Sequence, residues 1–96
     1  MRIIGTIEHA TCRIQVFQMS NKFSVKFELS MYEQTFKFRE SPYLKDFNDV
    51  QRLIDAAFIA QVIAHFDTMH ATADAGWQQF AQAQTLQIDN QWEDII

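Results

Sequence analysis

Apolar and polar residues alternate along most of the first 40 residues, as they do in strands that bury one face. The clearest stretches are 12–16 and 23–29, and a two-residue turn at 20–21 joins them into a predicted hairpin. A one-residue slip would turn the apolar set toward solvent, so the alternation supports this pairing. The facing pairs that the turn predicts are Ile14 with Phe27 and Val16 with Val25.

Two further tight turns, at 9–10 and 31–32, extend this hairpin into a four-stranded meander. The facing pairs that these turns predict are Ile3 with Val16, Ile7 with Cys12, Val25 with Phe38 and Phe27 with Phe36. Gln34 is the one polar residue on the resulting apolar face. We therefore predict antiparallel strands near 2–8, 11–19, 22–30 and 33–39.

A helix is predicted over 46–71, with Asn48 as its N-cap and Gln51 at the capping-box position. The run of small residues from Ala71 to Gly76 predicts a break, at which either Gly76 ends the helix or Asp74 caps a second one, and a C-terminal segment is predicted at 74–96. The predicted fold class is α+β: a four-stranded antiparallel β-meander packed on one face by a long α-helix, with a short C-terminal helical segment. The meander at 1–40, the helix and the C-terminal segment are expected to form one domain spanning 1–96.

The predicted helix carries apolar residues on two sides, although one sheet can cover only one of them. The side expected to cover the sheet follows Phe47, Ile54 and Val62. The second side is left for the C-terminal segment of the same chain, for a second subunit or for a partner protein. The partner-binding residues that this pattern predicts are Ile59, Ile63, Phe66, Trp77, Phe80 and Trp92.

The charge is polarised along the chain, whose net charge is −4. Residues 1–45 hold seven Lys or Arg and four Asp or Glu, whereas residues 46–96 hold one and eight. Such polarity can steer an oppositely charged partner. Because Arg52 is the last basic residue, we do not expect the helical part to neutralise nucleic-acid phosphates.

The chain lacks the sequence features of an enzyme. Its only glycines are Gly5 and Gly76, so it has no glycine-rich phosphate loop, and its single cysteine, Cys12, lies in an apolar stretch that predicts burial. We expect no catalytic activity and no cofactor. The first residues lack a secretion signal and no stretch is apolar enough to span a bilayer, so we expect a cytoplasmic protein without a membrane partner.

Two alternative sites rest on weaker patterns. An open sheet face with basic and aromatic residues can bind single-stranded nucleic acid, and the expected register places Arg2 opposite Phe17 on that face, with Ile4 and Met19 beside them. Asp67, His70 and Asp74 follow i, i+3, i+7 spacing, which offers a possible metal or small-molecule site near the end of the main helix.

The excess apolar helix surface and the polarised charge favour a small protein–protein interaction module. The partner is either a second copy, giving a homodimer, or another protein that the chain binds as an inhibitor, immunity protein or adaptor. The sequence does not indicate a pathway.

Overall fold

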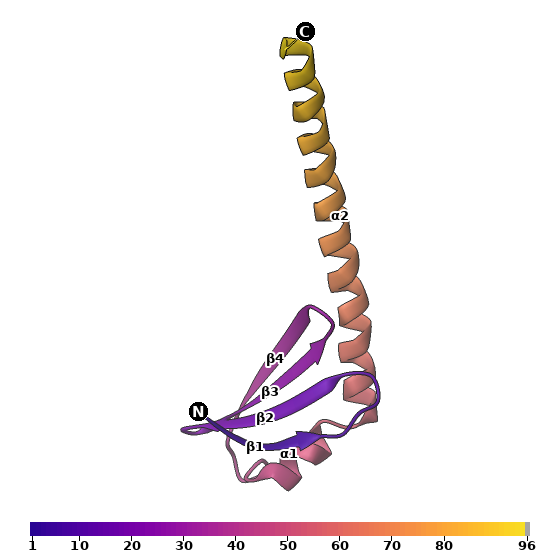
Figure 1. Ribbon diagram of the computed structural model, residues 1–96. Helices are drawn as coiled ribbons and strands as arrows, with labels where there is room; N and C mark the ends of the chain where they lie inside the picture. The colour runs from indigo at the N-terminus through magenta and orange to yellow at the C-terminus, as the bar shows by residue number, and fades with distance from the viewer. Residues whose placement is uncertain (96) are drawn as a thin grey trace. The chain divides into compact units, whose positions relative to one another are not determined.

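The protein is described by a computed structural model that places the backbone of residues 1–95 and the side chains of residues 1–85 (Figure 1). Its elements are β1 (Arg2–Ile7), β2 (Arg13–Met19), β3 (Lys22–Leu29), β4 (Tyr32–Arg39), α1 (Phe47–Leu53) and α2 (Ala56–Ile95). The chain divides into two compact units, Met1–Phe66 and Asp67–Ile96, and each is described by itself.

The four strands form one antiparallel sheet in the order β1-β2-β3-β4, as Figure 1 shows. The predicted α+β class and the four-stranded meander are therefore confirmed. The β2–β3 pairing is the predicted one, with Ile14 opposite Phe27 and Val16 opposite Val25. The turn between these strands is also the expected Ser20–Asn21 pair, in which Ser20 has a left-handed backbone with φ of 49°.

The two other predicted registers, β1 with β2 and β3 with β4, are wrong. In both, most residues lie opposite a partner two positions away from the predicted one. Phe36 lies opposite Val25 and Phe38 opposite Phe23, because the turn lies at Ser30–Met31 and not at 31–32. Ser30 supplies the left-handed residue of that turn, with φ of 57°. Because side chains alternate with a period of two, this two-residue shift leaves the apolar side chains of β4 on the predicted face.

β1 differs from prediction by a longer connection and a bulge. Ile7 lies opposite Ile14 and Gly5 opposite Val16, whereas Ile3 lies opposite Phe17. The register changes between Ile3 and Gly5, which is where an extra residue enters one strand. The predicted pairs of Ile7 with Cys12 and Ile3 with Val16 are therefore wrong.

The core of the unit Met1–Phe66 lies between the sheet and the helices. Phe58, from the first turn of α2, contacts three aromatic rings of β3 and β4. Its ring centroid lies 5.9 Å from that of Phe27, 5.2 Å from that of Phe36 and 6.3 Å from that of Phe38. Offset and edge-to-face ring pairs at these separations stabilise a core beyond their buried area, so Phe58 is a main contact between α2 and the sheet.

The single helix predicted over 46–71 is two helices in the structure. α1 ends at Leu53, and its C-cap residue Ile54 has a φ of −87° and a ψ of 71°, which are not helical. Asp55 then accepts a hydrogen bond of 2.9 Å from the backbone N–H of Phe58, as an N-cap residue does at the start of a new helix. The break expected near Gly76 is absent, because α2 continues through 74–95 without interruption.

Gln34, the polar residue predicted on the apolar face, reaches the helix. Its side-chain amide donates a 2.8 Å hydrogen bond to the backbone carbonyl of Val62 in α2. The amide is therefore satisfied although the side chain is partly buried.

Gly5 lies directly beneath an aromatic ring from α1. A Cβ atom at this position would come within 2.6 Å of the Phe47 ring, which is closer than non-bonded carbon atoms approach one another. The absence of a side chain at Gly5 is what allows Phe47 to pack on β1.

Candidate interaction surfaces

Three residues predicted to bind a partner belong instead to the core or its margin. Ile59 is only 6% exposed and Phe66 only 2%, both within the unit Met1–Phe66, and Ile63 is half-buried. The prediction that the second apolar side of the helix, at 59–66, is left uncovered is therefore wrong. Once the chain breaks at Ile54–Asp55, α2 begins a new helical phase, and its first turns bury Ile59, Val62 and Phe66 together.

Trp77 and Phe80, also predicted to bind a partner, are open to solvent in the unit Asp67–Ile96. Trp77 is 65% exposed and Phe80 54% exposed, and their ring centroids lie 5.6 Å apart. Residues three apart share one side of a helix, so the two rings form a continuous patch, here called the aromatic face. Every residue from 70 to 80 is exposed. The side chain of Trp92 lies outside the described residues.

The aromatic face lies beside acidic side chains. Asp74 and Asp67 lie within about 80° of Trp77 around the helix, on the same flank. Both are exposed. The sequence from Asp67 to the end holds five acidic residues and no Lys or Arg, so this unit presents aromatic groups in a negative field.

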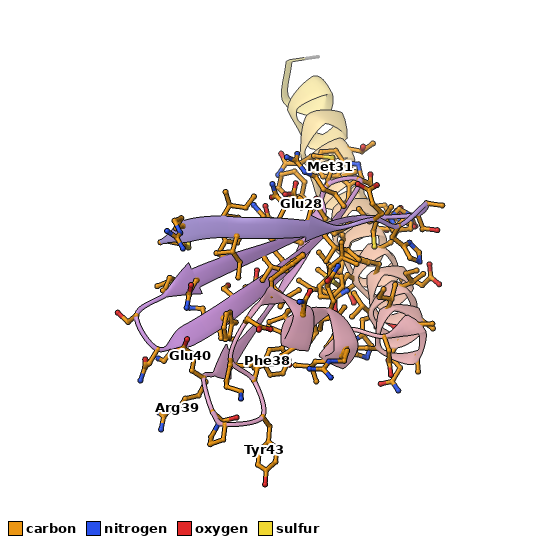
Figure 2. All side chains as sticks on the ribbon, turned by 90° about the horizontal axis from the view of Figure 1, so that it is seen from below. Glu28, Met31, Phe38, Arg39, Glu40 and Tyr43 are labelled. Carbon is orange, nitrogen blue, oxygen red and sulfur yellow. The ribbon has the colours of Figure 1, made fainter. Side chains whose placement is uncertain are left out.

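The connection between β4 and α1 forms a hollow that the sequence interpretation missed. Its volume is about 760 Å³. The residues that line this β4–α1 hollow are Phe38, Arg39, Ser41, Pro42, Tyr43, Leu44, Lys45, Asp49, Arg52 and Leu53. Figure 2 shows Arg39 and Tyr43 pointing away from the sheet at this end of the domain. The hollow thus combines apolar side chains with three basic ones.

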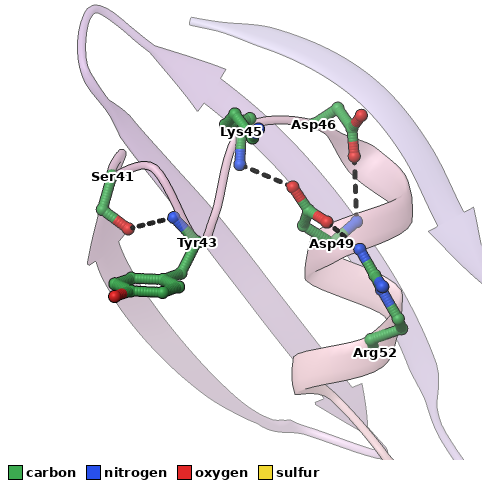
Figure 3. Close-up of polar contacts among 6 residues, drawn as sticks. All are labelled: Ser41, Tyr43, Lys45, Asp46, Asp49 and Arg52. Carbon is green, nitrogen blue, oxygen red and sulfur yellow. Dashed lines mark hydrogen bonds and ion pairs between the residues drawn. The ribbon is translucent and has the colours of Figure 1, made fainter.

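A tight turn holds Tyr43 at the rim of this hollow. The backbones of Ser41 and Leu44 exchange two hydrogen bonds of 3.1 Å, which leaves Pro42 and Tyr43 as the two turn residues. Pro42 fixes the backbone φ angle of the first turn residue. The Ser41 hydroxyl also accepts a 3.1 Å hydrogen bond from the backbone N–H of Tyr43 (Figure 3). The Tyr43 side chain is 92% exposed, so a well-fixed backbone presents a free aromatic ring.

The start of α1 forms the other wall of the hollow, and its cap differs from prediction. Asp46, not Asn48, is the N-cap, because its carboxylate accepts a 3.0 Å bond from the backbone N–H of Asp49. Asp49 in turn accepts a 2.8 Å bond from the backbone N–H of Lys45 and pairs with Arg52 (Figure 3). The hydrogen bond from Lys45 is the main reason that the pKa of Asp49 is lowered, and Arg52 adds to the effect.

This lowered pKa predicts a pH-dependent contribution of Asp49 to stability. A carboxylate with a lower pKa in the folded state stabilises the protein above its unfolded pKa of about 4 and loses that contribution as the pH falls through the folded pKa. Asp49→Asn is therefore expected to destabilise the protein at neutral pH and to differ less from wild type in acid. Urea unfolding between pH 7 and pH 3 measures this. Asn48→Ala, which removes no titratable group, should have the same effect at each pH, and a pH-independent effect of Asp49→Asn would contradict the assignment.

The outer sheet face brings together only part of the predicted nucleic-acid site. Phe17 and Met19 lie on it, but Ile3 and not Arg2 is opposite Phe17, because of the bulge in β1, and Ile4 lies at the bulge itself. The Lys26 ammonium lies 5.7 Å from the Phe17 ring centroid, over the ring, and 3.2 Å from Glu28. An incoming base would have to displace this cation in order to stack on the ring.

The predicted metal site is not formed within the described part of the chain. No group of three potential ligands is close enough there to hold an ion. Asp67 and Asp74 are separated by seven residues, or about 10 Å along one helix, so their carboxylates do not converge. Asp74 instead accepts a 3.1 Å hydrogen bond from the Gln78 amide. Asp67, His70 and Asp74 therefore do not form a three-ligand metal site within the described part of the chain.

Cys12 is buried, as its apolar neighbours predict, and burial raises the pKa of its thiol. It contributes to a second hollow, of about 420 Å³, between the end of β1 and the start of β2. A buried thiol with a raised pKa is protonated at neutral pH and is a poor nucleophile.

Over the described residues, none of the helices has the combined length and apolar character needed to cross a membrane.

Comparison with known proteins adds no relative. The chain matches no protein-family model, no curated protein and no solved structure.

Of the surfaces described above, the sequence pattern predicted the aromatic face but not the β4–α1 hollow. The available signal for the hollow was the run Ser41-Pro42-Tyr43, a turn sequence with an aromatic residue at its tip.

Proposed function

We propose that this protein is a protein–protein interaction module and that the aromatic face of α2 is its recognition element. The single observation that carries the proposal is the joint exposure of Trp77 and Phe80 on one side of a helix. Large aromatic residues contribute much of the binding energy at protein interfaces, and Trp is the residue most enriched among such anchors.

The lack of packing on the middle of α2 also supports this proposal. Helices in proteins owe most of their stability to the packing of an apolar face. The residues from Ala71 to Phe80 are all exposed, so this part of α2 lacks such packing. A partner that buried the aromatic face would supply it.

The experiment compares a double variant of the aromatic face with a matched control on the same helix. Trp77→Ala/Phe80→Ala removes both rings, whereas Gln79→Ala/Gln82→Ala changes two exposed residues away from Trp77. Both should leave the fold of the sheet unchanged by circular dichroism. If the partner is a second copy, we expect sedimentation velocity to show weaker self-association for the aromatic variant than for the control. If it is another protein, we expect the immobilised control, and not the immobilised aromatic variant, to retain it.

Trp77 also provides a direct signal for binding. In a Trp92→Phe background Trp77 is the only tryptophan, and its emission should shift to shorter wavelength when a bound protein buries it. Identical association by wild type and the aromatic variant, with no change in Trp77 emission, would reject the proposal.

A further inference from the structure

We propose that the β4–α1 hollow receives the aromatic face of a second copy of this chain. This inference rests on the proposed function of that face and adds the surface that binds it. In a pair of copies related by two-fold symmetry, the hollow of each copy would hold the aromatic face of the other, so the contact would be made twice.

Charge complementarity favours this partner. Arg39 and Lys45 lie at the hollow, and neither side-chain cation forms an ion pair within the described part of the chain. Asp67 and Asp74 flank the aromatic face and are exposed. Docking the face in the hollow would bring these two basic and two acidic groups together at the rim of a contact, where opposite charges set orientation and speed association.

The apolar parts of the two surfaces also match in kind and size. Tyr43 and Leu53 are exposed at the hollow, and Phe38 and Leu44 are half-buried there. The hollow is open to solvent, and its volume of about 760 Å³ leaves room for more than one side chain. Trp77 and Phe80 together are such a group, and their rings would replace water over Tyr43 and Leu53.

The same charges disfavour the simpler pairing of helix with helix. The unit Asp67–Ile96 has five acidic residues and no Lys or Arg, so two such helices side by side would place carboxylates against carboxylates. Like charges facing one another at an interface cost binding energy and select against that arrangement. The basic groups that an acidic helix needs are all in the other unit.

The buried area is sufficient only if the contact is made twice. Given their exposed fractions, Trp77 and Phe80 can bury about 250 Å² on their own side of one contact. One contact then buries about 500 Å² in total and two bury about 1,000 Å², which is the lower bound for a specific interface. A symmetric dimer of modest affinity is therefore the expected assembly.

The test exchanges the charges of the two surfaces in the full-length chain. Arg39→Glu/Lys45→Glu reverses the hollow, and Asp67→Lys/Asp74→Lys reverses the flank of the aromatic face. By sedimentation equilibrium, each variant alone should dimerise at least about tenfold more weakly than wild type, because like charges then face one another. A mixture of the two variants should recover dimers, since every contact between unlike chains is again complementary.

The matched control, Arg2→Glu/Lys37→Glu, makes the same charge change at exposed residues outside the hollow and should leave dimerisation unchanged. A wild type that stays monomeric at high concentration would overturn this inference. So would dimers that Trp77→Ala/Phe80→Ala abolishes but charge reversal of the hollow does not, although the proposed function would then survive. Binding of short single-stranded oligonucleotides that is lost on Arg39→Glu/Lys45→Glu would also overturn it, because it would assign the hollow to nucleic acid.

Discussion

Replacing Phe58 with alanine is expected to lower the free energy of unfolding by about 3 kcal/mol, near the lower end for buried aromatic residues. The reason is its contact with Phe27, Phe36 and Phe38, which links α2 to two strands at once. Truncation would remove all three ring contacts and leave a cavity between helix and sheet. Urea unfolding followed by far-ultraviolet circular dichroism measures the change.

Two further variants, Phe58→Leu and Phe80→Ala, serve as controls for this measurement. Phe58→Leu keeps an apolar side chain and should cost less than about 1.5 kcal/mol, so the site can be tested even if the alanine variant fails to fold. Phe80→Ala removes the same ring from an exposed position and should change stability by less than about 0.5 kcal/mol. Equal effects at Phe58 and Phe80 would contradict the assignment of Phe58 as a core contact.

The two glycines of the chain are expected to respond to alanine with opposite signs. Gly5→Ala places a methyl group against the Phe47 ring, at 2.6 Å before any adjustment, and should destabilise the protein by about 1–3 kcal/mol. Gly76→Ala meets nothing within 4 Å and replaces glycine inside α2, so it should stabilise that helix by about 0.5–1 kcal/mol.

A double-mutant cycle separates the contact from a general effect of glycine replacement. Phe47→Leu removes the ring that the new methyl group would strike, so Gly5→Ala should cost less in that background than in wild type. Additive effects of Gly5→Ala and Phe47→Leu would show that the close approach to Phe47 is not the cause. Thermal unfolding of the four proteins gives the coupling energy directly.

The sequence predicted which face of each strand is buried more reliably than it predicted strand register. Apolar alternation distinguishes odd from even positions, so it placed Phe36 and Phe38 on the inner face although their partners in β3 were wrong. Register depends on turn geometry, and Ser30 with its left-handed backbone carries no sequence mark as clear as Asn-Gly. The local signal for the bulge near Ile4 was Gly5, because an isolated glycine inside a strand is often found at a bulge.

The helix boundaries were mispredicted for a related reason. Asp55 lies between the two helices and caps α2. Neither glycine nor proline lies nearby to indicate a break at this point. Gly76 looked like a terminator, but one glycine costs only about 1 kcal/mol in a helix, and α2 tolerates it. The phase error at 54–55 is what led Ile59 and Phe66 to be assigned to a partner surface when they are core residues.

The hydrogen bond from Gln34 to Val62 has a consequence for the axial position of α2 on the sheet. Phenylalanine rings offer broad contact surfaces, and a helix can exchange one such contact for another if it slides by a turn of about 5.4 Å. The amide of Gln34 cannot make that exchange without losing its partner, at a cost of about 1–3 kcal/mol for an unsatisfied buried donor. A single polar group amid aromatic neighbours therefore selects one alignment from several of similar hydrophobic energy.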